Sequence, residues 1–275
     1  GRHTKLVYNP FFIAMGSTMR DFLNPEFVLF GRDDELALKI GKDFYKTISS
    51  APIYDTTIEN AELIKVCYNT MISTKISFVN TIMEACHHLP NTNVDDVTNA
   101  LKLANRRLIS GSYMDGGMGD GGGCHPRDNI ALSWLSDELG LRFNWFDNIM
   151  KQREVQTEWL VDMIEKESNG LPITILGKSF KPQTNITTGS PSILLFNILR
   201  ERGLSATMYD PYIDEPFGDW QDMSEYDGLP QCYFIGTKHE DFVNFPFDDE
   251  SIIIDPWRFI PDKEGCKVIR IGDNN

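Results

Sequence analysis

The chain has 275 residues, of which 41% are hydrophobic and 11% aromatic, and its formal net charge at pH 7 is −14. This length is sufficient for two domains with cores of their own. The negative charge argues against nucleic acids and anionic membranes as partners, because binding to phosphate-rich surfaces needs a basic face. No apolar run approaches the ~18 residues of a membrane-spanning helix, and no signal peptide is recognisable.

The five cysteines are widely spaced and include no C-x-x-C pair. An odd number without such pairs favours a reducing compartment over a disulfide framework or a zinc site. We therefore expect a cytoplasmic protein without a bound metal.

The first 56 residues predict the tail of an α/β domain. Strand-like and helical patterns alternate, with strands expected at 5–8, 27–31 and 52–56 and a helix at 33–48. Three strands and one helix are too few to bury a sheet face unaided. Residues 1–56 are therefore expected to be the remnant of a larger N-terminal domain.

Residues 57–169 are expected to form a helical domain. Thr57 suits the N-cap of a helix over 58–89, which contains neither Gly nor Pro. Further helices are expected at 94–104, 127–139 and 142–168. Long helices of this kind often carry a subunit interface, so we expect a homodimer or a higher homo-oligomer through them.

Residues 170–275 alternate between strand and helix, which predicts an open parallel sheet covered by helices. The strands are expected at 173–177, 206–210, 232–236 and 251–255, and a helix at 193–202. Ligands of such sheets bind beyond the carboxyl ends of the strands. These ends are Gly177, Asp210, Gly236 and Asp255. The fold class is therefore α/β, with a helical domain in the centre of the chain.

The stretch MDGGMGDGGGCHPRD, residues 114–128, contains six glycines and a cysteine. Gly117, Gly119 and Gly122 spell G-x-G-x-x-G, the pattern of a dinucleotide-binding loop. That loop requires a strand before the first glycine and a helix opening at the last. Here no clear strand precedes the stretch, and Cys124 intervenes before the helix. The context therefore argues against a phosphate-binding loop.

A nucleophile is the other functional interpretation of this stretch. Cys124 precedes a helix start, where free N–H groups and the helix dipole favour a thiolate. Glycines at 121–123 have no side chains and allow a substrate carbon to approach the sulfur. Asp128 follows by about one helical turn and is suited to positioning or deprotonating a water molecule. A flexible glycine loop with an incidental cysteine remains the alternative.

The long helix over 58–89 offers a second pair of polar residues. Lys65 and Asn69 are four positions apart and share a helix face. In one interpretation, the ammonium of Lys65 reaches solvent past apolar neighbours. In the other, Lys65 and Asn69 together stabilise a developing oxyanion. Helical periodicity does not decide between them.

Three segments, in this order, resemble the UDP-glucose/GDP-mannose dehydrogenase family. They are AELIKVCYNTMISTKISFVN at 61–80, GDGGGCHPRDNIAL at 119–132, and ITILGKSFKPQTN through YDP at 173–211. The similarity extends from about Asn9 to about Arg258. The resemblance implies a central dimerisation and catalytic domain at 57–169 and a C-terminal Rossmann-like domain at 170–275 for the nucleotide sugar. It also implies that residues 1–56 are the tail of an NAD-binding Rossmann domain.

The activity that the resemblance implies is NAD-dependent oxidation of a nucleotide sugar such as UDP-glucose at C6, from alcohol to acid, in two hydride transfers. This reaction belongs to polysaccharide biosynthesis. Cys124 falls on the family's catalytic cysteine, which captures the aldehyde as a thiohemiacetal that becomes a thioester. Asp128 corresponds to the aspartate near the hydrolytic water. Lys65 and Asn69 correspond to the pair that steadies the C6 oxygen.

Substrate-binding residues are also implied. Lys181 corresponds to a lysine near the nucleotide sugar, and Arg258 to a basic residue of the C-terminal binding site. Arg107, or less well Arg106, resembles an arginine supplied by the partner subunit. Phe12 and Tyr113 complete the set of residues expected to bind substrate.

Three departures from the family pattern are evident. A first portion of the NAD-binding domain, on the order of a hundred residues, is absent from the sequence. Phe11 and Met15 stand where many relatives have acids, and Thr188 falls where an arginine is usual. Two alternatives to the enzyme therefore stay open. One is a non-enzymatic nucleotide-sugar-binding or dimerisation module that has lost its cofactor domain. The other is a small hydroxy-acid oxidoreductase, which would not need Cys124.

Overall fold

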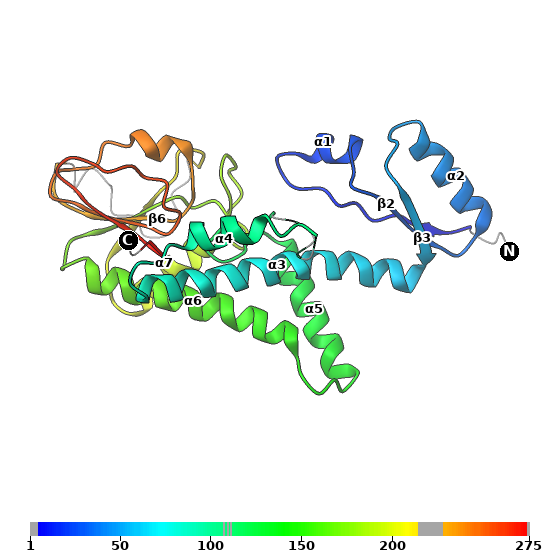
Figure 1. Ribbon diagram of the computed structural model, residues 1–275, viewed down its shortest axis with the longest axis horizontal. Helices are drawn as coiled ribbons and strands as arrows, with labels where there is room; N and C mark the ends of the chain where they lie inside the picture. Colours follow the sequence, from blue (N-terminus) through cyan, green and yellow to red (C-terminus); the bar gives the residue numbers. More distant parts are fainter. Residues whose placement is uncertain (1–4, 107, 109, 111, 214–227, 274–275) are drawn as a thin grey trace. The chain divides into compact units, whose positions relative to one another are not determined.

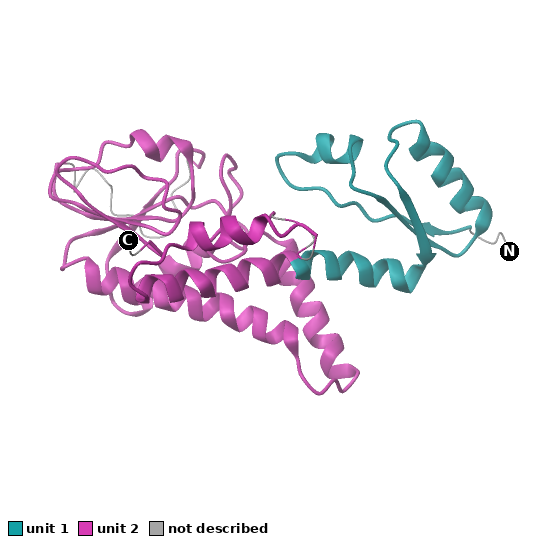
Figure 2. Cartoon of the chain, in the orientation of Figure 1, with its two compact units in different colours: residues 1–71 teal, residues 72–275 magenta. Residues whose placement is uncertain are grey.

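A computed structural model of the chain describes residues 5–106, 108, 110, 112–213 and 228–273 (Figure 1). The chain divides into two compact units, Gly1–Met71 and Ile72–Asn275 (Figure 2). The boundary falls within the long helix α3 (Ile58–His88), which contributes residues to both units. The division into three domains at 56 and 169 stays a prediction.

The first unit contains a small three-stranded sheet and two short helices. In chain order these are β1 (Val7–Tyr8), α1 (Thr18–Leu23), β2 (Val28–Arg32), α2 (Glu35–Lys46) and β3 (Ile53–Thr57). Strands β2 and β3 are parallel and β1 is antiparallel to β2. Phe30 of β2 packs with Leu38 and Tyr45 of α2 in a small core. The predicted strand–helix–strand pattern is confirmed, and α1 is an addition to it.

The second unit begins with helices. The remainder of α3 is followed by α4 (Val94–Lys102), α5 (Cys124–Glu138) and α6 (Trp145–Glu167). Asn93 caps α4 by accepting hydrogen bonds from the backbone N–H groups of Asp95 and Asp96. Helix α5 begins at Cys124, three residues before the predicted start, because Pro126 is tolerated in a first helical turn.

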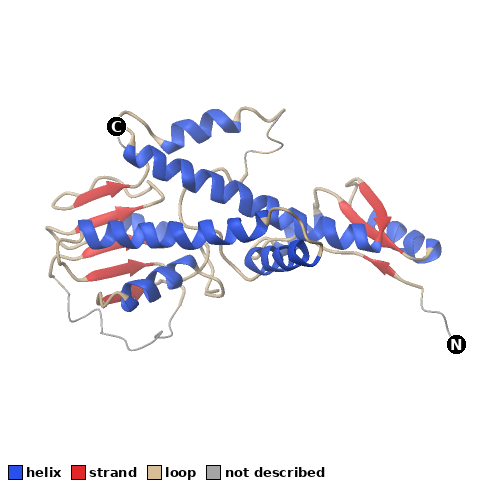
Figure 3. Ribbon diagram, turned by 90° about the horizontal axis from the view of Figure 1, so that it is seen from below, coloured by secondary structure: helices blue, strands red, loops and turns tan. Residues whose placement is uncertain are grey.

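A five-stranded sheet completes the second unit (Figure 3). Its strands are β4 (Ile173–Leu176), β5 (Ala206–Tyr209), β6 (Cys232–Ile235), β7 (Ile252–Asp255) and β8 (Lys267–Arg270). The order is β5-β4-β6-β7-β8, and every neighbouring pair is parallel. Helix α7 (Pro191–Glu201) follows β4, and a short 3-10 helix, η2 (Glu240–Asn244), follows β6. The predicted parallel sheet is confirmed, with β8 as an unpredicted edge strand.

Both faces of this sheet are covered, as the apolar strand sequences require. In β6, Cys232 and Phe234 join a large core shared with α3, α6 and α7. Tyr233 and Ile235 join a second core on the other face, with Phe242 of η2. The alternation follows from the two-residue period of a strand. Full burial of one such side chain stabilises the fold by roughly 1.5–3 kcal/mol.

The strand order fixes where a ligand of this sheet is expected. Strand β4 lies between β5 and β6. From the carboxyl end of β4 the chain continues to β5 on one side, and from the carboxyl end of β6 it continues to β7 on the other side. Sheets of this order bind ligands in the crevice at that switch point. The nearby residues Gly177 and Gly236 are therefore close to the expected nucleotide-sugar site.

Across the described residues, the search for membrane spans found no helix with the length and apolar character that crossing a bilayer requires.

Candidate active site

Cys124 is the first residue of α5 and is exposed. The N-cap residue, Gly123, has no side chain to bond the free N–H groups of the first turn. Arg127 lies within that turn, and its Nε atom is 3.1 Å from Oδ1 of Asp128. Asp128 is buried, whereas the Arg127 side chain is 68% exposed. The first turn of α5 therefore presents a thiol, a guanidinium and a carboxylate together.

Arg127 interacts electrostatically with both Asp128 and Cys124. A hydrogen bond and the charge of Asp128 raise the pKa of Arg127, and Cys124 adds smaller contributions of the same sign. The guanidinium thus places a positive charge in the same helical turn as the nucleophile candidate. The sequence interpretation missed Arg127, although a cation three residues after a cysteine in one helical turn was a usable signal.

The glycines before Cys124 make room for side chains of the C-terminal part of the unit. A Cβ atom on Gly117 would lie 2.1 Å from the Trp257 ring, and one on Gly121 would lie 2.9 Å from Cβ of Phe180. Gly122 has a positive φ of 81° and also abuts the Phe180 ring. Close packing against these two aromatic residues therefore accounts for much of the glycine run.

Gly123 is different from the other glycines of the run. The nearest atom to a Cβ on Gly123 would be Cγ2 of Thr188, at 3.8 Å. The space directly before Cys124 is thus less crowded than the rest of the loop, as access of a substrate carbon to the sulfur would require.

A buried polar network anchors the middle of the loop. Asp120 accepts a 2.6 Å hydrogen bond from Oγ of Ser73 on α3, and Ser73 in turn accepts one from Asn129 of α5 at 3.0 Å. Nε of Arg153 on α6 donates to the Asp120 carbonyl at 2.9 Å. Nδ1 of His125 lies 3.7 Å from the Asp120 carboxylate. Three helices thus hold one residue of the loop, four positions before the sulfur.

In the first unit, Lys65 and Phe12 are in contact. Nζ of Lys65 donates a 2.8 Å hydrogen bond to the Phe11 carbonyl and lies 4.8 Å from the centre of the Phe12 ring. The Phe12 ring in turn lies 4.7 Å from the ring of Tyr68. Asn69 is buried on the same helix. The structure therefore brings Lys65 and Phe12 together, while Cys124 belongs to the second unit.

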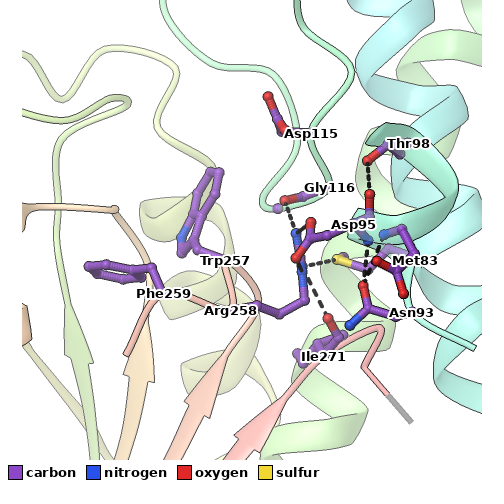
Figure 4. Close-up of polar contacts among 12 residues, drawn as sticks. Met83, Asn93, Asp95, Thr98, Asp115, Gly116, Trp257, Arg258, Phe259 and Ile271 are labelled. Atoms are coloured by element: carbon purple, nitrogen blue, oxygen red, sulfur yellow. Dashed lines mark hydrogen bonds and ion pairs between the residues drawn. The ribbon is translucent and has the colours of Figure 1, made fainter. Parts of the chain in front are cut away.

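Arg258, which is expected to bind substrate, has its side chain buried in the second unit. Its side chain is 4% exposed, and Nε and Nη2 bond both carboxylate oxygens of Asp95, at 2.8 and 3.0 Å (Figure 4). Nη2 also donates to the Gly116 carbonyl and Nη1 to the Ile271 carbonyl. Nη1 further contacts Sδ of Met83 and the Pro256 carbonyl. Every N–H of the guanidinium thus has an internal partner, and its expected contact with substrate stays a prediction.

The other expected substrate residues have varied positions. Lys181 is half-buried, and its Nζ lies 5.8 Å from the centre of the Phe180 ring, the ring that covers Gly121 and Gly122. Tyr113 is exposed and has a positive φ of 62°. Arg107 lies outside the described residues, and Arg106 is exposed.

A buried ionisable cluster lies at the carboxyl ends of β4 and β5. The Asp210 carboxylate accepts hydrogen bonds from the backbone N–H groups of Lys178 and Ser179 and lies 3.2 Å from Nε2 of His239. Burial alone would raise the pKa of Asp210, but the hydrogen bonds from His239 and the backbone lower it to about 2. Burial lowers the pKa of Lys178 to about 8. Of the residues in this cluster, only Asp210 was named from the sequence, as the end of a strand.

Replacing Lys178 with methionine is expected to stabilise the second unit at pH 7. The pKa of Lys178 is lower in the folded chain than the usual 10.5, so folding disfavours its protonated form. That cost is fully present below pH 8 and fades as the pH rises through 10.5. Urea unfolding should show a gain of about 1–3 kcal/mol at pH 7 and little gain above pH ~11.

The control for this comparison is Lys238→Met, because Lys238 is an exposed lysine of the same unit. That variant should leave the free energy of unfolding within about 0.5 kcal/mol of the wild-type value. Destabilisation by Lys178→Met at pH 7 would show that burial of the ammonium does not dominate its energetics.

Comparison with known proteins identifies the helical region. Residues 59–154 match the sequence profile of the UDP-glucose/GDP-mannose dehydrogenase family, central domain. The chain belongs to this family. The matched segment includes Lys65, Asn69, Cys124 and Asp128, and it lies within the segment 57–169 expected to form the central domain.

Characterised family members resemble the chain over part of their length. UDP-glucose 6-dehydrogenase TuaD of Bacillus subtilis is 31% identical over 215 residues, which are 77% of this chain and 46% of TuaD. UDP-glucose 6-dehydrogenase AglM of Haloferax volcanii is 26% identical over 278 residues, which are 94% of this chain and 64% of AglM. The chain thus spans 46–64% of the length of these relatives.

A solved structure confirms the fold. The UDP-glucose dehydrogenase from the hyperthermophilic archaeon Pyrobaculum islandicum matches with a TM-score of 0.86 and 26% identity. The match covers 97% of this chain and 63% of the archaeal chain. The predicted α/β fold class, with its helical domain and parallel sheet, is therefore that of a family member.

The first unit does not fit the adenosine pyrophosphate of NAD, the cofactor that the family resemblance implies. A dinucleotide-binding βαβ unit presents glycine N–H groups at the start of its helix. The sequence at the end of β2 and before α2 is instead Gly31-Arg32-Asp33-Asp34, and the Asp34 carboxylate caps the helix by accepting from N–H of Ala37. A negative charge at that helix end repels a phosphate. Among the described residues, no group of three His, Cys, Asp or Glu forms a candidate metal site.

Proposed function

We propose that this chain is the sugar-handling part of a nucleotide-sugar 6-dehydrogenase, which oxidises a UDP-glucose-like substrate at C6 to the uronic acid. The observation that carries the proposal is the exposed Cys124 at the start of α5, which shares its helical turn with Arg127 and lies one turn from the buried Asp128. Family membership and the names of the relatives support the substrate class. The five cysteines, all free, support a cytoplasmic location.

The proposed role of Cys124 is covalent. Its sulfur bonds to the C6 aldehyde carbon, and the thiol proton goes to the aldehyde oxygen, which gives a thiohemiacetal. Loss of a hydride and a proton from this adduct gives a thioester. Water then adds to the thioester carbon, the carbon–sulfur bond breaks, and the sulfur regains a proton as the acid leaves. Arg127 and the N–H groups of α5 stabilise the anionic sulfur in the bond-forming and bond-breaking steps.

Other residues receive roles from the family resemblance. We assign Asp128 to the water that hydrolyses the thioester, and its burial one turn from the sulfur supports this role. We assign Lys65 and Asn69 to the C6 oxygen, and Phe12, Tyr113, Lys181 and Arg107 to substrate binding. Lys65 holds its ammonium beside the Phe11 carbonyl and the Phe12 ring, which supports a positioned cation over a mobile one.

Both oxidations require a hydride acceptor, and we propose NAD on the basis of the family resemblance. The turn between β2 and α2 does not suit the NAD pyrophosphate, so we give it no role in binding the cofactor. The residues of this chain bind the sugar, hold the covalent intermediate and direct the water.

The direct test supplies UDP-glucose and NAD to the protein, in the longest form that its coding sequence specifies, and follows NADH by absorbance and the uronic acid by mass spectrometry. Two NADH per acid are expected, with GDP-mannose as the comparison substrate. Calorimetric binding of UDP-glucose without NADH formation would instead establish the non-enzymatic module. Turnover that survives complete alkylation of Cys124 would favour an oxidoreductase without a covalent step.

We further propose that the central helices form a homodimer. Several large apolar side chains of α5 and of the turn into α6 are exposed: Ile130, Trp134, Leu139, Leu141, Phe143 and Trp145. Ile130 and Trp134 are four residues apart and share one face of α5. Clustered exposure of this kind marks an interaction surface more often than scattered apolar residues do.

Replacing Trp134 with lysine is expected to convert the dimer into a monomer, because a charged ammonium at an apolar interface is strongly unfavourable. Light scattering coupled to size-exclusion chromatography measures the mass directly. The matched control is Leu103→Lys, which changes an 82% exposed apolar residue just after α4. A wild-type mass equal to that of one chain would exclude the proposed dimer.

A further inference from the structure

The turn after β7 is rigidly built and presents two side chains to the glycine-rich loop. The fully buried Asp255 carboxylate accepts backbone hydrogen bonds from Trp257 at 2.8 Å, Phe259 at 2.7 Å and Ile260 at 2.8 Å. These three bonds fix the backbone from the end of β7 onward. The side chains of Trp257 and Arg258 therefore leave the turn in defined directions (Figure 4).

Arg258 reaches across to the loop and to α4. It bonds both carboxylate oxygens of Asp95 and donates to the Gly116 carbonyl at 2.9 Å. Its own backbone has a positive φ of 55°, a conformation that non-glycine residues avoid. Such strain persists only where surrounding contacts impose it. The contacts of Arg258 are thus specific and not those of a loosely held surface arginine.

Trp257 holds the adjoining residue of the loop. Its ring lies where a side chain of Gly117 would be, and its indole N–H donates to the Ile235 carbonyl at 3.0 Å. The backbone of Gly117 is bonded on both sides as well, since its N–H donates to Asn80 at 3.0 Å and its carbonyl accepts from Gln156 at 2.8 Å. Two helices and the turn after β7 therefore hold this one residue.

A loop so rich in glycine needs external anchors, because glycine has the greatest backbone freedom of any residue. The segment between Gly117 and Cys124 has no regular secondary structure. Displacement of a nucleophile by about 1 Å is enough to slow a reaction by roughly a hundredfold. Fixing the start of the segment therefore bears directly on where the sulfur lies.

We propose that Trp257 and Arg258 are positioning residues, which fix the Gly116–Gly117 segment and thereby the loop that ends in Cys124. The proposal rests on the proposed function of Cys124 as nucleophile. Asp95 contributes to the same anchoring, because its carboxylate neutralises the buried guanidinium of Arg258 and pairs it with α4. Arg258 thus acts on the reaction through the loop.

The test compares Arg258→Met with Arg202→Met by hydrogen–deuterium exchange and by steady-state kinetics. Arg202 is the matched control, because it also pairs with two carboxylates, Asp162 and Glu165, which lie on α6 and not in the loop. In Arg258→Met, amides of residues 114–123 should exchange about tenfold faster or more. The kcat for acid formation should fall about 10–100-fold, with KM for UDP-glucose within about twofold of wild type. Arg202→Met should show neither change.

Two outcomes overturn the proposal. One is unchanged exchange of residues 114–123 in Arg258→Met. The other is a rise in KM alone, which would make Arg258 a substrate ligand. Exchange needs no turnover, so an inactive wild-type protein would defeat the proposed function while still allowing the anchoring of the loop to be tested.

Two further variants cover the case in which Arg258→Met does not fold. Arg258→Lys keeps the charge beside Asp95 but lacks the donors to reach Gly116 and Ile271 together, so loop exchange should be intermediate between wild type and Arg258→Met. Gly117→Ala disturbs the same contact from the loop side, because its methyl group meets the Trp257 ring. It should also accelerate loop exchange and lower kcat, and normal values of both would overturn the role of Trp257.

Discussion

Replacing Cys124 with serine is expected to lower the rate of uronic acid formation by about 10³-fold or more. The serine hydroxyl is a weak nucleophile at neutral pH unless a base removes its proton. The N–H groups of α5 and the Arg127 guanidinium stabilise an anionic sulfur, but they do not supply a base. The measurement is the yield of acid per unit time with UDP-glucose and NAD.

Cys67→Ser is the matched control for this prediction. Cys67 is also free and exposed, but it lies on α3 and away from the start of any helix. Its replacement should leave acid formation within about twofold of wild type. In the wild-type protein, an acyl-enzyme trapped by rapid acid quench should map to the peptide containing Cys124. An intact mass without such an adduct, together with an active Cys124→Ser, would contradict covalent catalysis.

Replacing Asp120 with alanine is expected to lower the free energy of unfolding of the second unit by about 3 kcal/mol. The Asp120 carboxylate is buried and accepts the 2.6 Å hydrogen bond from Ser73, and the guanidinium of Arg153 lies 3.9 Å from it. Removal of the carboxylate leaves a hydroxyl and a largely buried cation without this acceptor. Activity should fall with stability, because the same residue anchors the loop before Cys124.

Urea unfolding followed by tryptophan fluorescence measures the free energy of unfolding of the second unit. All five tryptophans follow residue 72, so the signal reports the second unit. Asp162→Ala is the control, since Asp162 forms an exposed pair with Arg202 that should contribute no more than about 1 kcal/mol. Equal losses in the two variants would show that the network around Asp120 has no special energetic role.

Regular elements with strong periodicity were predictable from the sequence. The apolar strands around Ile175, Phe234 and Ile253 are buried on both faces, so their composition was a clear signal. Strand β8 was missed because Lys267 and Arg270 place charges at both of its ends, as suits an edge strand. Helix α1 was missed because it is short and has no buried residue.

The chemical residues of the candidate site were predictable only in part. Cys124 and Asp128 follow from their spacing at a helix start, and α5 places them one turn apart. The contacts of Trp257 with Gly117 and of Phe180 with Gly122 join segments far apart in the sequence, and no local pattern announces them. For the same reason, the inward direction of Arg258 was not foreseeable, because its carboxylate partner lies on a helix of the central region.

The contact between Gly117 and the Trp257 ring makes the identities of these two positions interdependent. As long as an indole fills this space, position 117 tolerates no side chain, however well the new residue suits the loop itself. A chimera that exchanges residues 170–275 for those of a relative would therefore keep this packing only if the new segment also places an indole at position 257. An exchange of this kind would require both positions to be designed as a pair.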